Sequence, residues 1–208
     1  MSSPFRYTPR ESHKSIQLAR AAAIEAYANL EQQLCLQFMD LMECDYSKAS
    51  IVFYKITSTH FRNRILQTLL NQEYGDTYKK FWGSLIKLIR QIDQERNKVV
   101  HWHLVGQEPI EDGEMAEEDE LVLAPHAGSD EKALTVEALW EFVEKTEYVR
   151  CQAIMFYIFH LTRPSPEARQ ADKTYEAFLR PCSYPPQANN LGFHIGPIPE
   201  TPPQSPEK

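Results

Sequence analysis

The chain has 208 residues, 42% of them hydrophobic and 11% aromatic, which suffices for one well-filled core but not for several. This content excludes a wholly disordered chain, and seven glycines against fourteen prolines disfavour a turn-rich all-β protein. The net charge is −7, but residues 1–100 hold fourteen basic against ten acidic side chains, and residues 101–208 hold eight against nineteen. The whole chain therefore disfavours non-specific binding to nucleic acid, whereas its first half does not.

Cysteine usage and hydropathy predict a soluble cytoplasmic protein. The four cysteines show neither CxxC pairs nor metal-ligand spacing, so we expect reduced thiols. Residues 1–10 contain no apolar run, so we expect no secretory signal. The longest apolar stretch, residues 153–161, falls far short of the roughly 18 residues needed to span a membrane, so we expect no membrane association.

Three helices are predicted before Gly75. The first begins near Ser15 and carries apolar residues at spacings of three and four. Asp45 is a good N-cap for a shorter helix over residues 49–56. A third helix begins at Thr57-Ser58-Thr59 and ends at Gly75. The expected apolar faces are Ile16, Ala19, Ala23, Tyr27, Leu30, Leu34, Phe38 and Leu41 on the first helix, and Phe61, Ile65, Leu66, Leu69 and Leu70 on the third.

A long helix is predicted from the Asp76-Thr77 cap to about Trp102. A second apolar stripe beside its main face predicts contact on a second side, with another helix or with a partner subunit. The main face consists of Phe81, Leu85, Leu88, Ile92 and Val99, and the second stripe of Trp82, Ile86, Ile89 and Val100.

After Trp102 two strand-like runs, 103–105 and 121–124, flank a segment with eight carboxylates, 108–120, and predict a small β-hairpin insertion over residues 103–125. We interpret its acidic loop as a solvated segment; shielding a cleft from RNA or imitating a polyanion are the functional alternatives. Thr135 opens the last helix, which ends before Arg163-Pro164.

Ten prolines follow Arg163, so we expect residues 163–208 to form a mostly extended or disordered tail, in which residues 168–179 could form a short helix or dock on the body. The predicted architecture is an all-α bundle of four or five helices over residues 10–162, with one small β-hairpin insertion and this proline-rich tail.

Residues 94–103, Gln-Glu-Arg-Asn-Lys-Val-Val-His-Trp-His, turn polar at the end of the long predicted helix. At about 100° per residue, Asn97 and His101 lie one turn apart opposite the core face, while Arg96 lies at the edge of that face, roughly 140° from His101. A regular helix therefore does not bring the guanidinium and the imidazole to one atom. Either the helix loosens here, or the Arg96 side chain reaches around it, or a second chain completes the site.

The run Arg96-Asn97-Lys98-Val99-Val100-His101 resembles the R-x(4–6)-H motif of the HEPN superfamily, whose members are helical bundles. A polar residue after the arginine is the usual form there. The early Ala-Ile-Glu-Ala-Tyr-Ala-Asn-Leu-Glu run, the middle Phe-Arg-Asn-Arg-Ile-Leu run and the late helix are also similar to a stand-alone bacterial protein of this superfamily. The resemblance covers roughly residues 10–162.

The resemblance implies a metal-independent endoribonuclease without cofactors, in which two protomers set both motifs around one cleft. His101 would act as general acid or base on the ribose 2′-hydroxyl or the leaving 5′-oxygen. Arg96 would stabilise charge on the phosphoryl oxygens, and Asn97 would orient His101 or the phosphate. The expected assembly is a homodimer that binds RNA, with a protein antitoxin as a further partner. Many HEPN-like proteins are catalytically silent, so a nucleic-acid-binding or protein-binding module in a toxin–antitoxin or stress setting stays open.

Cationic side chains near the motif are the expected contacts to RNA phosphates. We expect Arg62, Arg64, Lys98 and His103 to make them, although a solvated helix face has the same composition. The purely structural alternative for Arg96 is an ion pair with one of four carboxylates: Glu25, Glu31, Asp93 or Glu95.

The run His101-Trp102-His103 has a spacing that binds metal in other folds. No further cluster at ligand spacing supports such a site, so we predict no metal.

Overall fold

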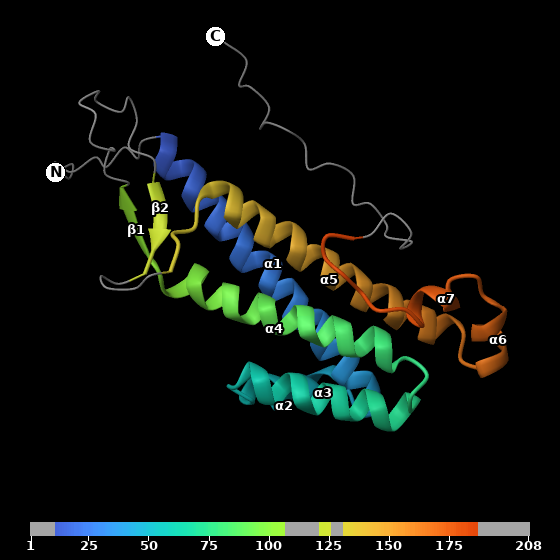
Figure 1. Cartoon of the computed structure of the whole chain (residues 1–208). Helices are drawn as coiled ribbons and strands as arrows, with labels where there is room; N and C mark the ends of the chain where they lie inside the picture. Colours follow the sequence, from blue (N-terminus) through green and yellow to red (C-terminus); the bar gives the residue numbers. More distant parts are fainter. Residues whose placement is uncertain (1–10, 107–120, 126–130, 187–208) are drawn as a thin grey trace, which may run out of the picture.

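The computed structural model describes residues 11–106, 121–125 and 131–186. They form a mostly helical bundle with one small antiparallel hairpin, as the sequence predicts (Figure 1). The elements are α1 (Glu11–Leu41), α2 (Tyr46–Lys55), α3 (Thr59–Tyr74), α4 (Lys79–His101), β1 (His103–Gly106), β2 (Leu121–Ala124), α5 (Val136–Thr162), α6 (Pro166–Ala171) and α7 (Tyr175–Phe178).

The two long helices α1 and α5 lie side by side, and α4 packs against both (Figure 1). The predicted stripe of α1 is buried from Ile16 to Phe38, and its small residues Ala19 and Ala23 are fully enclosed. Thr135 caps α5, since its hydroxyl accepts a hydrogen bond from the Ala138 N–H at 3.3 Å. The core therefore lies between these three helices.

Helix α4 buries its main apolar face and the second stripe except for Val100, which is exposed. Its predicted main face is buried, and Trp82 of the second stripe packs against Phe156 of α5 with ring centroids 4.9 Å apart. The second contact is therefore another helix of the same bundle. The predicted cap is not formed, because α4 begins after Tyr78 without a side-chain cap and Asp76 instead pairs with Lys79 at 2.9 Å.

Helices α2 and α3 form a layer below α4 in Figure 1. Asp45 caps α2 by accepting the Lys48 N–H at 2.9 Å, and Ser58 caps α3. Helix α3 ends at Gly75, whose φ of +57° is the left-handed conformation that favours glycine. Its apolar face differs from expectation: Leu66 and Leu70 are buried, but Phe61 and Ile65 are exposed.

The β-hairpin follows the last turn of α4. Strands β1 and β2 are antiparallel, with His103 opposite Ala124, which confirms the two predicted strand-like runs. Leu123 anchors the hairpin, because it is fully buried and exchanges two backbone hydrogen bonds with Leu134 at 2.9 and 2.8 Å. The acidic segment 108–120 lies outside the described residues.

The first part of the predicted tail is folded onto the bundle. Helices α6 and α7 lie at the end of the molecule away from the hairpin (Figure 1), and Phe178 is buried against Phe81, Phe156 and Phe159. The expectation of an extended tail therefore does not hold for residues 166–178, whereas docking through Phe178 does. Prolines at 164 and 166 flank a helix start, where proline is tolerated, rather than exclude it.

None of the helices in the described ranges combines the length and hydropathy that crossing a bilayer requires.

Candidate functional site

The motif occupies the last two turns of α4. Arg96 is half-buried, whereas Asn97 and His101 are exposed. The helix stays regular to its end, because the Trp102 N–H still donates to the Lys98 carbonyl at 2.9 Å. Loosening of the helix, the first of the three arrangements considered for this motif, is therefore not observed.

The Arg96 guanidinium is held by a ring and an amide. Its Cζ lies 4.6 Å from the centroid of the Tyr27 ring of α1, a cation–π contact. Its Nη1 donates to Asn97 Oδ1 at 3.2 Å. Asn97 lies one turn before His101 on the same side of α4, so this hydrogen bond links the guanidinium to the neighbour of His101 on the helix.

The carboxylates considered as partners for Arg96 are engaged elsewhere or too far away. Glu95 pairs with Lys145 of α5 at 2.7 Å, and Glu31 pairs with Arg62. Asp93 accepts hydrogen bonds from two neutral side chains. Among the described residues no carboxylate lies within ion-pair distance of Arg96 or His101.

A buried polar cluster supports the Tyr27 ring. The Tyr27 hydroxyl donates to Asp93 Oδ1 at 2.8 Å, and Asn63 Nδ2 of α3 donates to Asp93 Oδ2 at 2.7 Å. Burial, followed by the Asp93 charge, raises the pKa of the Tyr27 hydroxyl well above its usual value. The hydroxyl therefore stays protonated as a donor, and the cluster ties α1, α3 and α4 together beneath Arg96.

Arg20 is a site residue that the sequence analysis missed. Its Nη2 donates to the Val100 carbonyl at 2.8 Å, so a second guanidinium from α1 lies at the end of α4 beside His101. A cation is favourable there because the last carbonyls of a helix carry partial negative charge. The available signal was its spacing, since Arg20 precedes Tyr27 by two turns and shares its face of α1.

The four expected RNA contacts lie in different surroundings. Arg62 is only 9% exposed; it pairs with Glu31 and its Cζ lies 4.8 Å from the Phe53 ring centroid, so it is not on the surface. Arg64 is exposed on α3. Lys98 pairs with Glu131 at 3.1 Å and lies over the Trp102 ring. His103 is exposed on β1, two residues after His101.

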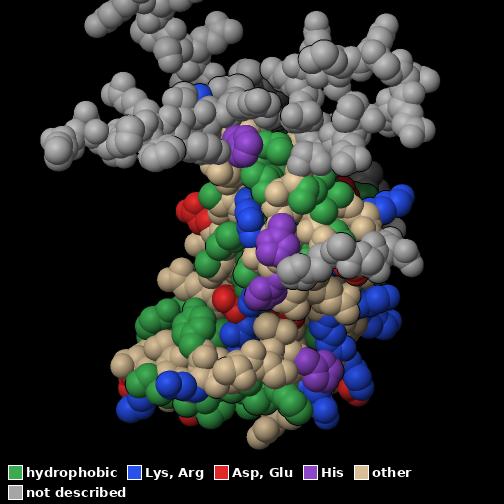
Figure 2. Space-filling view, turned by 90° about the vertical axis from the view of Figure 1, so that its left-hand side faces the viewer, with side chains coloured by type: hydrophobic (Ala, Val, Ile, Leu, Met, Phe, Trp, Pro, Cys, Tyr) green, Lys and Arg blue, Asp and Glu red, His purple; other side chains and the backbone are tan. Residues whose placement is uncertain are grey.

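Figure 2 looks onto the side of the molecule where α4 ends and the hairpin begins, and histidines lie there among basic side chains. Within the described ranges, no three His, Cys, Asp or Glu side chains come close enough together to hold a metal ion. The structure thus brings Arg20, Arg96, Asn97 and His101 to one end of α4, which we call the α4 end.

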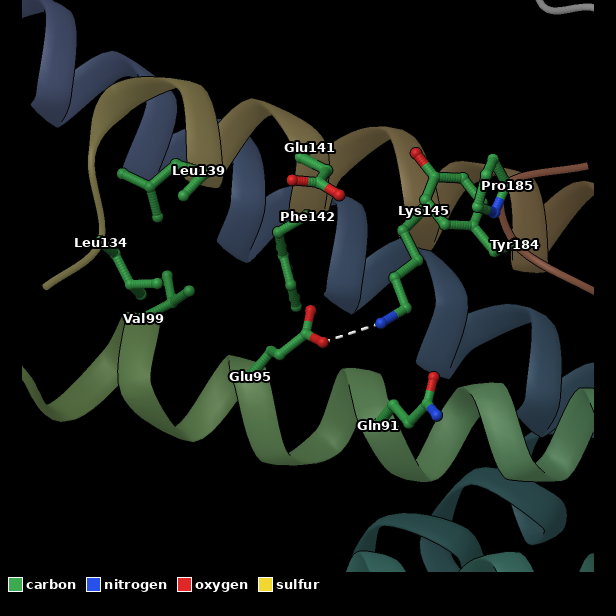
Figure 3. A pocket seen from close by; sticks show the side chains of 11 residues that line it. Gln91, Glu95, Val99, Leu134, Leu139, Glu141, Phe142, Lys145, Tyr184 and Pro185 are labelled. Atoms are coloured by element: carbon green, nitrogen blue, oxygen red, sulfur yellow. Dashed lines mark hydrogen bonds and ion pairs between the residues drawn. The ribbon is translucent and has the colours of Figure 1, made fainter. Parts of the chain in front are cut away.

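A cavity of about 360 Å³ lies on the other side of α4, between α4 and α5. Figure 3 shows Glu95 and Lys145 pointing toward one another across it, with Tyr184 and Pro185 at one end. Its remaining walls are mostly apolar, from Val99, Leu139 and Phe142 among others. Glu95 and Lys145 pair with one another in this cavity, and the Glu141 carboxylate also lines it.

Comparison with protein-family models, with curated proteins and with solved structures found no match for this chain. The resemblance to the HEPN superfamily therefore rests on the motif and on its place at the end of a long helix in a bundle.

Proposed function

We propose that this chain is a cytoplasmic HEPN-like protein that binds RNA and cleaves it without a metal ion, as a homodimer. The observation that carries this proposal is the α4 end: the Arg96 guanidinium reaches Asn97, the His101 imidazole is exposed, and no described carboxylate lies within ion-pair distance of either side chain. A cation paired with a carboxylate could not serve a phosphate in the same way.

The chemistry suited to these groups is attack by a ribose 2′-oxygen on the adjacent phosphorus. His101 takes the 2′-hydroxyl proton, the new P–O bond forms, and the bond to the 5′-oxygen breaks. The imidazolium then returns the proton to that 5′-oxygen, which leaves a 2′,3′-cyclic phosphate and a 5′-hydroxyl. Arg96 stabilises the negative charge that accumulates on the phosphoryl oxygens, and its planar fork suits two of them at once.

The surroundings of the motif suit a phosphate chain. Arg20 adds a second guanidinium at the α4 end, and His103 follows on the same part of the chain. Lys98 lies there too, but a phosphate must replace Glu131 as its partner. Such cationic groups bind the phosphate backbone of RNA and position it, but they do not distinguish one base sequence from another. Arg64 lies further away on α3, and we leave Arg62 out because it is buried and paired.

The test is RNA cleavage in the presence of a chelator. We expect the wild-type chain to cut single-stranded RNA but not DNA of the same sequence, because DNA lacks the 2′-hydroxyl. His101→Ala should lower the rate by about 10² to 10⁴, and Arg96→Lys should lower it although the charge is kept. His60→Ala, which removes an exposed histidine of α3, is the matched control and should leave the rate unchanged.

Equal cleavage by wild type and His101→Ala would assign the activity to a contaminant and refute the proposal. RNA binding without cleavage would favour the non-catalytic binding module instead.

A further inference from the structure

The cavity between α4 and α5 is a space that the proposed RNA chemistry does not use. Four separate parts of the chain form its walls: α4, the segment before α5, α5 itself and the residues that follow α7. Figure 3 shows Glu95 on α4 and Glu141 on α5, on opposite sides of it. Its volume of about 360 Å³ lies within the range of roughly 300–1,000 Å³ that is usual for ligand-binding cavities.

Contacts with the rest of the bundle hold this cavity at both ends. At one end, Leu134 is bonded to strand β2 through two backbone hydrogen bonds of 2.9 and 2.8 Å. At the other end, the Cys182 N–H donates to Ser84 Oγ at 2.6 Å. The Tyr184 ring lies 5.8 Å from the Tyr148 ring, centroid to centroid. The walls are therefore in place before a ligand arrives, so little binding free energy is lost in ordering them.

The charged groups of the cavity leave one carboxylate unpaired. Lys145 Nζ pairs with Glu95 Oε1 at 2.7 Å, and the Lys145 side chain is only 14% exposed. Glu141 also lines the cavity, and no described cation lies within ion-pair distance of it. Two glutamates against one lysine leave the cavity negative. Burial, followed by the charges of Glu144, Glu141 and Glu95, accordingly raises the pKa of the Tyr184 hydroxyl.

Apolar surface lies beside this unpaired carboxylate. Leu134, Ala138 and Tyr184 are half-buried and Pro185 is exposed, so all four are within reach of a ligand in the cavity. A metal ion would leave this surface in contact with water, whereas an organic cation covers it. The part of the chain that the structure describes also contains no group of three His, Cys, Asp or Glu side chains that could hold a metal ion.

We propose that this cavity binds a small organic amine, a ligand with one ammonium group and a compact apolar body. The ammonium pairs with Glu141, and the apolar body lies against Ala138 and Tyr184. A ligand with a carboxylate is disfavoured, because Lys145 is already held by Glu95 and the remaining charge is negative. The cavity has room for about a dozen water molecules at about 30 Å³ each, so one aromatic ring with a short chain fits it.

Titration of the full-length, ¹⁵N-labelled chain with 2-phenylethylamine, followed by amide chemical shifts, tests the site. For a ligand of about nine non-hydrogen atoms beside an exposed carboxylate, we expect a dissociation constant on the order of 1 mM. The shift changes should concentrate at Val99, Ala138 and Lys145. The alcohol 2-phenylethanol has the same shape without the charge and should bind about fivefold more weakly. The anion 3-phenylpropionate should bind more weakly still.

Two substitutions separate the carboxylate from the apolar wall. Glu141→Gln should weaken binding of the amine about fivefold and leave 2-phenylethanol unaffected, because only the charged ligand loses its partner. Ala138→Phe should remove binding of both compounds, because the added ring occupies the cavity. Glu25→Gln, which changes an exposed carboxylate of α1 outside the cavity, is the control and should change neither. Circular dichroism should show that the three variants stay folded.

The absence of saturable shift changes up to about 20 mM 2-phenylethylamine would overturn the proposal. Equally tight binding of the alcohol or of 3-phenylpropionate would overturn the assignment of an amine. Shift changes that persist in Ala138→Phe would place the ligand outside the cavity and overturn the site.

The amine site and RNA cleavage can fail separately. The cavity lies on the other side of α4 from Asn97 and His101, and its binding is measured without RNA. Binding of the amine by a chain that does not cut RNA would keep the cavity site and refute the proposed enzyme. RNA cleavage by a chain that does not bind the amine would do the reverse.

Discussion

The Tyr27 side chain connects the buried Asp93 carboxylate to the motif at the end of α4. Its hydroxyl donates to Asp93, and its ring makes a cation–π contact with Arg96. We expect Tyr27→Leu to free the guanidinium and to lower single-turnover RNA cleavage by about tenfold, because a positioned charge is worth more than a mobile one. Tyr27→Phe keeps the ring and should retain more of the rate. Equal losses in both variants would show that the ring does not position Arg96.

Tyr27→Phe nevertheless leaves one oxygen of buried Asp93 without its donor. We expect a loss of about 1–3 kcal/mol in the free energy of unfolding, measured by urea denaturation. The two Tyr27 variants thus separate the ring's role from the hydroxyl's.

His160 makes the fold sensitive to acid. Its ring lies among Tyr74, Tyr78 and Phe156, and burial, followed by the charge of Arg169, lowers its pKa to about 4. In the unfolded chain the imidazole takes up a proton near pH 6.5, so the unfolded state binds more protons between the two values. The contribution of the neutral, buried imidazole to the free energy of unfolding is therefore fully present above pH 6.5. It is lost as the pH falls toward 4.

Allowing for partial exposure of His160, we expect about 2 kcal/mol of this loss to come from the imidazole. His160→Phe should remove that part of the pH dependence, which urea denaturation at pH 7 and pH 4.5 would measure. If the variant shows the same difference in the free energy of unfolding between the two pH values as the wild type, other groups cause the acid sensitivity.

At the scale of elements, α7 is a four-residue helix whose buried residue is Phe178. Phe178 lies 4.9 Å from Phe159 and 5.2 Å from Phe81, ring centroid to centroid. Phe178→Ala should lower the free energy of unfolding by about 3 kcal/mol, because it leaves a cavity among these rings. Lys173→Ala, at an exposed position just before α7, is the control and should change it little. A small effect of Phe178→Ala would mean that α7 is not docked in solution.

The sequence predicted those elements whose apolar period matches one buried face. The stripe of α1 and the main face of α4 were found this way, whereas cap chemistry located Asp45 and Thr135 and two strand-like runs located the hairpin after Trp102. Periodicity could not say which of two adjacent stripes of α3 is covered, because Phe61–Ile65 and Leu66–Leu70 have equal spacing. The extended tail was predicted from its prolines, but Phe178 is buried at α7, and Tyr175 and Leu179 pack against the core beside it.

Only part of the candidate site could be predicted from the sequence. Helix arithmetic placed Asn97 and His101 on one side of α4, but the reach of Arg96 depends on a ring of α1. Contacts between α1 and α4 join residues 66 to 80 positions apart, such as Tyr27 with Asp93 and Arg20 with Val100. A single sequence without a fold does not reveal such pairs.

For the whole molecule, the charge asymmetry limits how RNA can bind. The chain carries −7 overall, and the cations of the α4 end are few. We expect three or four phosphates to be contacted, which gives a slope of about −2 to −3 in the logarithm of RNA affinity against the logarithm of salt concentration. Fluorescence anisotropy between about 50 and 200 mM salt measures this slope. A slope steeper than about −6 would require a larger basic surface than the described residues provide.

The bond between Asn63 and Asp93 has a mechanical consequence. Asn63 lies on α3 between Phe61 and Ile65, but its amide faces inward to the carboxylate that also holds Tyr27. This carboxylate in turn binds the hydroxyl of the tyrosine whose ring lies under the Arg96 guanidinium. The position of α3 and the position of that guanidinium are thus linked through three consecutive side-chain contacts.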